Sequence, residues 1–548
     1  MAHALAGKPV QEQDIIDVQT IVDAYFDNVP DMTNPTQLVS FGTSGHRGTS
    51  VDGTFTDLHV AAITQAICDG RKQFGATGPI FVGQDTHALS QPALVTVLEV
   101  LAGNGVTAMV DCDMDFVPTP SVSRAIIRYN EEHDDKADGI IITPSHNPPD
   151  NGGIKYNTII GGPADTVVTK WIEMRANEYL TAYCESEDFK RISIDNIEPT
   201  AQVPYDYKGL YVEELGDVIN MEAIKAAGPK VLVDTLGGSG ASYWNAIKER
   251  YGLDLTIIHD DYDPTFSFMT YDHDGKVRMD CSSTYVMASV INRIGDFDLA
   301  VGNDPDYDRF GIVVSSGLIS ANTFLTLAAR YLFTTRGWKN KGVGKTVVCT
   351  TMIDKWAADA ETPVFEVPVG FKYFSQLLFD GAIGIGGEES AGASFLKKDG
   401  TVWTTDKDGM IMALLSMEIM AVMGKSALKM ADESLEEFGN PSFGRIDAPC
   451  KKEQKQILKQ MSAELITATT VDGDPITNIR ATSLYNDMPI DGVRVETDKG
   501  WFVARPSGTE DLYKIYGESY KGDLGLVALL TAGEEIVNAA LKGTIEIE

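Results

Sequence analysis

The chain has 548 residues, of which 43% are hydrophobic and 23% charged, a composition typical of globular proteins with sizeable cores. Its formal net charge of −34 argues against nucleic acid or an anionic membrane as a partner, because both require a basic surface. At roughly 100–200 residues per domain, this length indicates about three to five domains.

The cysteines are widely spaced and form no CxxC pair, so neither a zinc ribbon nor a dense disulfide framework is indicated. They are Cys68, Cys112, Cys184, Cys281, Cys349 and Cys450. In so large a chain they predict reduced thiols and a cytoplasmic location. The N-terminus lacks the basic and apolar regions of a signal peptide, and there is no run of about 18 apolar residues. We therefore expect no membrane span.

Apolar residues recur at helical spacing in Asp14–Phe26, which predicts a helix ahead of the first domain, and the turn-rich VPDMTNPT follows as a linker. A unit then recurs in which a short β-rich run ends in a Gly-rich or polar loop, often before a helical pattern. Such strands are predicted at Ile80–Val82, Gly139–Ile142, Val231–Val233, Leu299–Val301, Val347–Cys349 and Ile383–Ile385. Strands separated by helices predict α/β domains, and three pairs of units suggest three related domains in series.

The last hundred residues follow a different pattern. Val493–Thr497, WFVARPS (501–507) and LYKIYGES (512–519) are typical of consecutive strands joined by short turns, and Gly525–Leu541 is predicted to be a closing amphipathic helix. This pattern indicates a smaller α+β domain. The predicted domains are 1–205, 206–318, 319–440 and 441–548.

A stiff loop, TPSHNP (143–148), follows the strand-like GIII. Ligands of α/β sheets gather at the carboxyl ends of strands, so Ser145 is placed to act as a nucleophile or phosphate carrier, with His146 beside it to move protons. Taken alone, a proline turn with a capping serine explains the segment equally well. The GxSxG elbow of serine hydrolases is absent.

An acidic loop, DPDYDR (304–309), follows the strand-like DLAV. Carboxylates at Asp304, Asp306 and Asp308 can converge on one hard cation and leave positions open for a phosphate, which suits magnesium. An EF-hand is excluded because its sixth and twelfth positions need Gly and Glu, whereas the chain has Arg309 and Ser315. A solvated acidic turn is the plainer alternative.

Two further loops carry groups that suit a sugar phosphate. In GGEESAG (386–392), Glu388 and Ser390 can bond sugar hydroxyls. In RPSGTE (505–510), the Arg side chain can hold phosphate oxygens as a fork, the hydroxyls add donors, and the glycine exposes backbone N–H groups. Each is also compatible with an ordinary turn. Gly344-Lys345-Thr346 resembles the end of a Walker A loop, but its first glycine would fall at Lys339 and a strand follows instead of a helix.

Together these loops resemble the α-D-phosphohexomutase family, and they occur in that family's order over nearly the whole chain. The matching segments are FGTSGHRG (41–48), TPSHNP (143–148), GGIKYN (152–157), DPDYDR (304–309), PVGFK (368–372), GGEESAG (386–392), DKDG (406–409) and RPSGTE (505–510). The chain looks closest to the bacterial phosphoglucomutase branch. It differs from many relatives in having Pro305 and Tyr307, and His46 stands where other branches carry Leu.

The resemblance implies three similar α/β domains and a smaller C-terminal α+β domain around a central cleft. It implies that Ser145 carries the phosphate and that Asp304, Asp306 and Asp308 hold Mg²⁺ together with a phosphoserine oxygen. The remaining roles are also implied: Arg47, His146, Lys155 and Arg309 at the transfer site, Glu388 and Ser390 on sugar hydroxyls, Gly370, Lys372 and Lys407 orienting the substrate, and Arg505, Ser507, Gly508 and Thr509 on the distal phosphate.

The implied reaction is the interconversion of glucose 1-phosphate and glucose 6-phosphate, with one Mg²⁺ per chain and glucose 1,6-bisphosphate as intermediate and activator. Either Lys155 or His146 can serve as the general acid/base. The implied partners are small hexose phosphates, with neither nucleic acid nor membrane, in a monomer or homodimer. A mutase acting on mannose or glucosamine phosphate, a non-catalytic sugar-phosphate-binding protein and a magnesium-dependent phosphatase are the alternatives.

Overall fold

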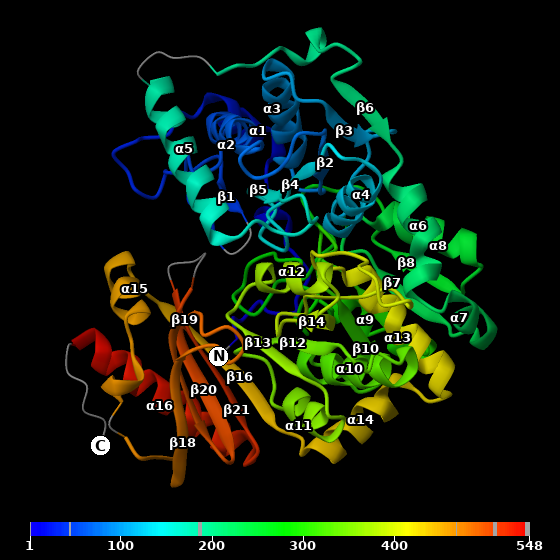
Figure 1. Cartoon of the computed structure of the whole chain (residues 1–548), viewed down its shortest axis with the longest axis vertical. Coiled ribbons are helices and arrows are strands. Elements are labelled where there is room, and N and C mark those ends of the chain that lie inside the picture. The colour runs from blue at the N-terminus through cyan, green and yellow to red at the C-terminus, as the bar shows by residue number, and fades with distance from the viewer. Residues whose placement is uncertain (1, 43–44, 185–188, 467, 508–511, 543–548) are drawn as a thin grey trace. The chain divides into compact units, whose positions relative to one another are not determined.

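The computed structural model describes residues 2–42, 45–184, 189–466, 468–507 and 512–542. The chain forms two compact units, whose elements are labelled in Figure 1. The first unit comprises Met1–Ser320, Phe374–Gly381 and Ser390–Leu428, and the second comprises Ala321–Tyr373, Ala382–Glu389 and Lys429–Glu548.

The first sheet of the first unit has six strands in the order β1-β5-β4-β2-β3-β6. Its strands are β1 (His46–Thr49), β2 (Ile80–Gln84), β3 (Ala108–Asp111), β4 (Asp138–Ile142), β5 (Asn151–Asn157) and β6 (Gln202–Tyr205). Strands β4, β2, β3 and β6 are parallel, whereas β1 and β5 are antiparallel to their neighbours. Gln84 pairs with Ile142 in this register, so the loops that follow β2 and β4 begin side by side.

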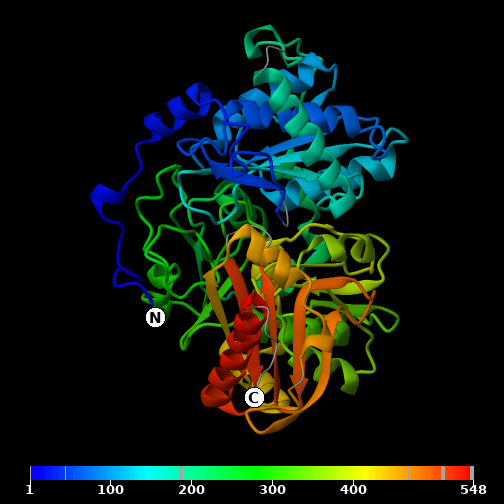
Figure 2. The ribbon, with the colours of Figure 1, turned by 90° about the vertical axis from the view of Figure 1, so that its left-hand side faces the viewer.

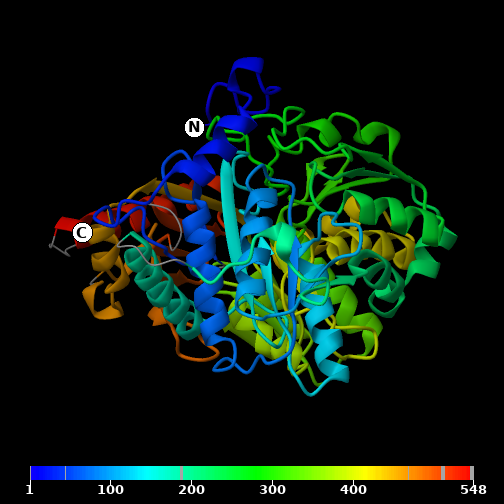
Figure 3. The same ribbon diagram turned by 90° about the horizontal axis from the view of Figure 1, so that it is seen from above.

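Helices cover both faces of this sheet (Figures 1 and 3). They are α2 (Asp57–Gly70), α3 (Ser90–Gly103), α4 (Thr119–Glu132) and α5 (Thr166–Cys184). Successive strand side chains point to opposite faces, so Ile140 and Ile142 join one apolar core while Ile141 joins another. Burial on both faces explains why β4 is a continuous apolar run and was predictable from the sequence.

The second sheet of this unit has the order β11-β10-β9-β7-β8. Its strands are β7 (Val231–Asp234), β8 (Leu255–Ile258), β9 (Leu299–Gly302), β10 (Gly311–Val314) and β11 (Gly317–Leu318), and its helices are α6 (Tyr207–Val218), α7 (Met221–Ala227), α8 (Ala241–Tyr251) and α9 (Ala288–Ile291). Strands β7 and β9 are parallel, with Asp234 opposite Gly302. The acidic loop, which starts after β9, therefore begins beside the Gly-rich loop that follows β7.

The N-terminal segment lies along the second sheet's domain before the chain enters the first (Figure 2). Backbone hydrogen bonds join His3, Gly7 and Val10 to the stretch Met269–His273. The helix predicted over Asp14–Phe26 is shorter at its start: α1 spans Val18–Asp27. The Asp17 carboxylate accepts a hydrogen bond from the backbone of Gln19 and so caps the helix there.

The second unit contains a parallel group of strands in which β12 (Gly342–Thr346) lies between β13 (Val364–Val367) and β14 (Ile383–Gly387). The strand predicted at Val347–Cys349 is wrong, because the segment GVGKT before it forms the strand instead. Val347 and Val348 are fully buried, but they pack against Trp501 and Val503 of the C-terminal sheet. Helices α10 (Ala321–Arg336) and α11 (Met352–Asp359) accompany these strands.

The C-terminal part of the second unit is an antiparallel sheet in the order β16-β21-β20-β19-β18-β17. The strands are β16 (Ser442–Pro449), β17 (Thr470–Val471), β18 (Asp474–Thr482), β19 (Pro489–Thr497), β20 (Gly500–Pro506) and β21 (Leu512–Ser519), with helices α15 (Lys452–Lys459) and α16 (Gly522–Lys542). The predicted hairpins and closing helix are therefore confirmed. The other elements of the chain are α12 (Lys372–Phe379), β15 (Ala393–Phe395), α13 (Gly409–Met423) and α14 (Ala427–Phe438).

Helix α16 is long and apolar enough to cross a membrane by length and composition only, although the sequence has no unbroken apolar run of that length. Its buried residues, however, recur on one face, among them Leu529, Gly533, Ile536 and Val537. That face packs on β16, β20 and β21 in the C-terminal core (Figure 1). This is the amphipathic pattern of a helix covering a sheet.

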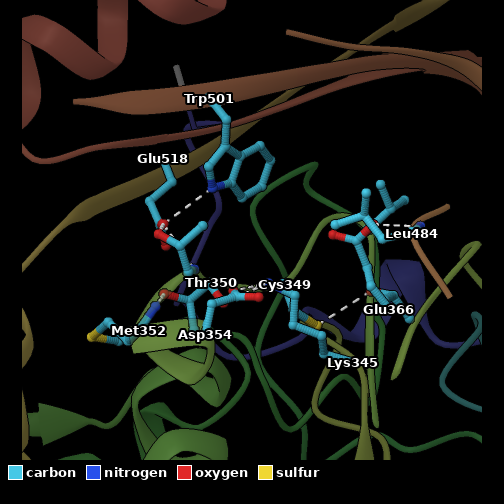
Figure 4. A network of polar contacts seen from close by, with 12 residues as sticks. Lys345, Cys349, Thr350, Met352, Asp354, Glu366, Leu484, Trp501 and Glu518 are labelled. Atoms are coloured by element: carbon cyan, nitrogen blue, oxygen red, sulfur yellow. Dashed lines mark hydrogen bonds and ion pairs between the residues drawn. The ribbon is translucent and has the colours of Figure 1, made fainter. Parts of the chain in front are cut away.

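Polar groups join the C-terminal sheet to the β12–β14 layer within the second unit (Figure 4). The Trp501 indole donates to Glu518 Oε1 at 3.1 Å, and that carboxylate oxygen also accepts from the Thr351 backbone at 2.9 Å. Glu366 Oε1 on β13 accepts a long hydrogen bond from the backbone of Leu484 at 3.4 Å. These bonds pair polar groups that would otherwise be costly to bury.

Candidate active site

The serine loop begins where β4 ends. Ser145 has a φ of +61°, in the left-handed region that non-glycine residues seldom adopt, and its side chain is buried. Its backbone N–H donates to Thr143 Oγ1 at 2.7 Å. Its hydroxyl donates to Asp304 Oδ2 at 3.0 Å and lies 3.3 Å from His146 Nδ1. The structure thus brings the predicted phosphate carrier to the predicted metal loop.

The acidic loop begins where β9 ends, and its three aspartates have no solvent exposure. The other carboxylate oxygen of Asp304 accepts from the Arg309 backbone at 2.9 Å. Lys155 Nζ lies 2.6 Å from Asp306 Oδ2 and 3.2 Å from Asp308 Oδ2. Lys155 comes from β5, so the register of the first sheet brings a cation to the loop of the second.

Two more groups of the first unit complete this cluster. Lys407 Nζ lies 2.9 Å from Asp308 Oδ2, so this predicted substrate-orienting residue contacts the acidic loop. Thr119, at the start of α4, donates its hydroxyl to Asp306 Oδ2 at 2.7 Å. Thr119 was not predicted, because nothing in the surrounding PTPS marks it as part of a site.

The donor set fits a hard divalent cation. One oxygen from each of Asp304, Asp306 and Asp308 lies within 4.8 Å of the others. Asp306 Oδ1 and Asp308 Oδ1 are buried and have no hydrogen-bond partner within the described residues. A buried carboxylate oxygen is costly without a partner, and oxygens are the ligands that Mg²⁺ prefers.

Burial and the closely spaced charged groups shift the pKa values of several residues in this cluster. Burial, followed by the neighbouring carboxylates of Asp306 and Asp308, raises the pKa of Asp304 well above its ordinary value. Burial opposes the charge on Lys155, but the same two carboxylates outweigh it and raise the pKa of the ammonium. Burial and then the Arg309 cation lower the pKa of His146 well below its usual range.

The acidic loop is shaped by the two residues that depart from many relatives. Tyr307 has a φ of +62° and is fully buried. Its ring fills the space that side chains at Gly238 and Gly240 would need, since a Cβ built on Gly240 would lie 2.3 Å from Tyr307 Cε1. Pro305 accepts from the backbone of Ser239 at 2.8 Å. The glycines of the loop after β7 thus leave the space that Pro305 and Tyr307 occupy.

The remaining predicted transfer-site residues lie around the serine loop. Arg47 donates to Asn147 Oδ1 at 3.4 Å. Arg309 donates to Asp280 Oδ2 at 3.4 Å, and His146 Nε2 lies 3.9 Å from the same oxygen. Asp280 was missed because it belongs to an irregular segment that no strand precedes. It places a carboxylate between the two predicted basic groups.

The predicted sugar-phosphate residues fall mostly in the second unit. There the Gly370 backbone donates to Glu388 Oε1 at 3.1 Å, which brings two of them together, and Lys372 begins α12 in the same segment. Arg505 is buried on β20, and its Nε has no hydrogen-bond partner among residues that the structure describes. Ser507 is buried after it.

Two predicted distal-phosphate residues, Gly508 and Thr509, lie outside the described residues. Ser390 belongs to the first unit. It precedes Gly392, which forms a β-bridge with Arg309 of the acidic loop.

Comparison with known protein families gives four matches in chain order. The alpha/beta/alpha domains I, II and III of phosphoglucomutase/phosphomannomutase match residues 38–182, 210–317 and 320–438, and the C-terminal domain of the same family matches 448–524. Together these matches cover most of the chain. The predicted architecture of three related α/β domains followed by a smaller domain is confirmed.

Individual relatives agree with this assignment. The phosphoglucomutase of Komagataeibacter xylinus is 46% identical over 539 residues, covering 97% of each chain. The parafusin phosphoglucomutase of Paramecium, in its open form, has a similar fold, with a TM-score of 0.72 at 20% identity over 95% of this chain and 97% of that one.

A more distant structure shares the fold: the N-acetylphosphoglucosamine mutase of Aspergillus fumigatus in complex with GlcNAc-6P and magnesium. Its TM-score is 0.53 at 16% identity, over 95% of this chain and 99% of that one. Four domain matches in order and a relative of nearly half identity over its whole length place the chain in one family. The chain belongs to the phosphoglucomutase/phosphomannomutase family, the α-D-phosphohexomutases.

Proposed function

We propose that the protein is a phosphoglucomutase that interconverts glucose 1-phosphate and glucose 6-phosphate through a phosphorylated Ser145. The observation that carries the proposal is the 3.0 Å hydrogen bond from Ser145 Oγ to Asp304 within a buried cluster of three carboxylates. A phosphate carrier needs a nucleophilic oxygen held beside groups that manage phosphate charge. The whole-chain similarity to a phosphoglucomutase supports glucose phosphates as the substrates.

Asp304, Asp306 and Asp308 are proposed to hold one Mg²⁺ per chain, with an oxygen of phosphorylated Ser145 as a further ligand. Two carboxylate oxygens without hydrogen-bond partners support this assignment. When bound, the cation shields the charge of the phosphoryl group during transfer. The fungal mutase of the same fold was solved with magnesium and a hexosamine phosphate, which is consistent with this chemistry.

In the first transfer, O6 of glucose 1-phosphate attacks the phosphorus on Ser145. The bond from phosphorus to Ser145 Oγ breaks, a bond to O6 forms, and the O6 proton passes to the protein and then to Ser145 Oγ. Lys155 and His146 are the two residues placed to carry that proton. Arg47 and Arg309 add positive charge beside the serine loop.

The resulting glucose 1,6-bisphosphate turns around, and Ser145 Oγ attacks the phosphorus on O1. The bond from phosphorus to O1 breaks, the Ser145 proton passes by way of the protein to O1, and glucose 6-phosphate is released. A single site on the protein must therefore hold the phosphate that is not being transferred, whether it is attached to O1 or to O6 of the sugar. Arg505, Ser507, Gly508 and Thr509 are proposed for that site, because a buried guanidinium beside small hydroxyl residues suits phosphate. The proposed sugar contacts are Glu388 and Ser390 on hydroxyls, with Gly370, Lys372 and Lys407 orienting the ring.

The test is a coupled assay of glucose 6-phosphate formation from glucose 1-phosphate, with Mg²⁺ and after removal of divalent ions with EDTA. We expect activity only with Mg²⁺, and mass spectrometry should locate a phosphate on Ser145 of the purified protein. S145A should lose at least roughly 1000-fold in kcat. An S145A variant with full mutase activity would refute the proposal.

Parallel assays separate the alternatives. Release of inorganic phosphate in place of isomeric sugar phosphate would identify a phosphatase. Faster turnover of mannose or glucosamine phosphates than of glucose phosphate would identify another mutase of the family. A phosphorylation-free protein that binds hexose phosphates without turning them over would identify a binding protein.

A further inference from the structure

The loop that follows β2 contains a buried Asp–His pair for which the reaction above has no role. Asp85 and His87 are 0% and 1% exposed, respectively. Parallel pairing of Gln84 with Ile142 places this loop against the serine loop, which follows β4. The segment GQDTHALS (83–90) is a polar loop after a strand, and no local sequence pattern indicates which residues it contacts.

The Asp85 carboxylate contacts the N-terminal side of the serine loop. Asp85 Oδ2 accepts a hydrogen bond from Thr143 Oγ1 at 2.5 Å, and Thr143 Oγ1 accepts one from the backbone N–H of Ser145 at 2.7 Å. The other oxygen, Oδ1, accepts from Ser90 and from the His87 backbone. The orientation of the Ser145 peptide is therefore tied to Asp85.

The imidazole of His87 contacts the C-terminal side of the same loop. Its Nδ1 lies 2.9 Å from Asp85 Oδ2, and its Nε2 lies 3.0 Å from the backbone carbonyl oxygen of Asn147. The Asn147 side chain in turn accepts from Arg47. Asp85 and His87 thus contact the serine loop on both sides of Ser145, at Thr143 and at Asn147.

Both ring nitrogens of His87 face oxygens that can only accept hydrogen bonds, so the ring is a doubly protonated imidazolium. Burial lowers the pKa of His87, but the carboxylate of Asp85 outweighs it and raises that pKa above the ordinary value. A histidine elsewhere in the same domain contrasts with this arrangement. His59 Nδ1 accepts from the Thr56 backbone at 3.2 Å while its Nε2 faces the Gln37 carbonyl at 2.8 Å, which requires a neutral ring.

We infer that His87, held by Asp85, is a positioning residue that keeps Ser145 in its strained left-handed conformation beside the acidic loop. The inference rests on the proposed function, because it assigns the pair a part in phosphoryl transfer through Ser145. A left-handed φ is unfavourable for a non-glycine residue and persists only where its surroundings enforce it. Asp85 acts through Thr143 Oγ1, which accepts the Ser145 N–H on one side, and His87 contacts the Asn147 carbonyl oxygen on the other.

The first test compares H87Q with wild type in the glucose 1-phosphate assay. Gln has a similar size but no charge, and its side chain has one donor nitrogen where the His87 ring has two. We expect kcat to fall about 10–100-fold, as for other residues that orient a reacting group, and KM to change less than threefold because no proposed sugar contact is altered. The rate at which glucose 1,6-bisphosphate rephosphorylates dephosphorylated Ser145, followed by intact-protein mass spectrometry, should fall by the same factor.

The double variant D85N/H87Q guards against a folding defect, because removing both charges leaves no uncompensated ion in the interior. It should fold and show the same loss of kcat. The matched control is H259Q, which breaks a second Asp–His pair, Asp234–His259, whose Nδ1–Oδ1 distance is 2.8 Å. Asp234 ends β7 and His259 follows β8, and among the described residues neither forms a hydrogen bond with the serine loop, so H259Q should keep kcat within twofold of wild type.

The outcomes separate this inference from the proposed function. If wild type and H259Q are inactive and Ser145 carries no phosphate, the proposed function fails and the inference with it. If they are active and either folded variant, H87Q or D85N/H87Q, keeps kcat and the rephosphorylation rate within twofold of wild type, the inference alone is wrong. A loss of kcat in H259Q equal to that in H87Q would also overturn it.

Discussion

Two clusters of buried charged side chains in this chain use their carboxylates differently. In the first unit, Asp304, Asp306 and Asp308 are fully buried, and two of their oxygens have no hydrogen-bond partner within the described residues. In the second unit, Glu366 on β13 lies 2.7 Å from the guanidinium of Arg480 on β18, and its second oxygen accepts from the same guanidinium.

We propose that the difference separates a reactive cluster from a structural one. Glu496 completes the second cluster: one oxygen contacts Arg480 at 3.2 Å and the other accepts from Asn478 at 3.0 Å. Every carboxylate oxygen there is paired, as expected where buried charge only holds a fold together. In the acidic loop two carboxylate oxygens have no hydrogen-bond partner within the described residues, which supports the proposal that a cation completes the set. The following experiments test this distinction, from the largest expected effect to the smallest.

Asp306→Asn removes one charge from the reactive cluster and keeps its shape. We expect kcat to fall roughly 1000-fold, about 4 kcal/mol of transition-state stabilisation, because the proposed cation site loses a carboxylate. The free energy of unfolding without divalent ions should change little, since the variant also relieves repulsion between neighbouring carboxylates. Coupled mutase assays over a range of Mg²⁺ concentrations measure the first quantity, and urea unfolding in EDTA measures the second. A variant with wild-type kcat would show that Asp306 is structural.

Glu366→Gln makes the matched change in the structural cluster. Arg480 would then be buried with a weaker acceptor, so we expect unfolding of the second unit to require about 3 kcal/mol less free energy. Urea unfolding followed by tryptophan fluorescence measures this, because Trp501 belongs to the same unit. At 25 °C the folded variant should keep wild-type kcat. Lost activity in a fully folded E366Q protein would contradict the distinction.

Mg²⁺ should stabilise wild type by binding only the folded first unit. At a free concentration of about 100 times the dissociation constant, the expected gain is roughly 2.7 kcal/mol. Urea unfolding with Mg²⁺ and with EDTA measures the difference. D306N should show little gain, whereas E366Q should show the full gain from its lower starting point. Equal stabilisation of wild type and D306N would place the cation elsewhere.

His59 is a third kind of buried ionisable group, because its ring is neutral. Its expected effect, on the pH dependence of the free energy of unfolding, is the smallest of those considered. Burial, followed by the neighbouring His46, lowers the pKa of His59 to about 3. Because the folded-state pKa lies below the unfolded value of about 6.5, the unfolded chain binds more protons between these values, and stability is lost as pH falls below about 6.5. At pH 5 the loss is about 2 kcal/mol at 1.36 kcal/mol per pKa unit.

His59→Gln isolates this contribution. Gln at the third position of α2 can accept the same hydrogen bond from the Thr56 backbone, as in a capping box, but it does not titrate. The stability difference between wild type and H59Q should therefore shrink or reverse by about 2 kcal/mol between pH 7 and pH 5. Parallel urea unfolding at the two pH values measures it. A constant difference would mean that His59 is already charged in the folded protein.

Much of the fold was predictable because buried strands in α/β domains are local apolar runs. The runs at β2, β4, β7, β9 and β14 were located to within two residues at each end. The strand predicted at Val347–Cys349 was wrong because β-branched residues are equally suited to a strand and to a buried loop. Here Val347 and Val348 are buried by packing against the C-terminal sheet, which no local pattern indicates. The three predicted domain boundaries stay predictions.

The sequence by itself determined the chemistry available to this protein: a serine after one strand, three aspartates after another, and an arginine loop between two hairpin strands. Each is a local pattern, so it could be found without knowing the fold. The tertiary structure decided which of them meet. Parallel pairing of β2 with β4 brings His87 to the carbonyl oxygen of Asn147 in the serine loop, and packing of separate sheets brings Thr119 and Asp280 to the site. Hydrogen bonds between residues far apart in the chain leave no periodic pattern in the sequence. No local pattern therefore predicted a role in the site for His87, Thr119 or Asp280.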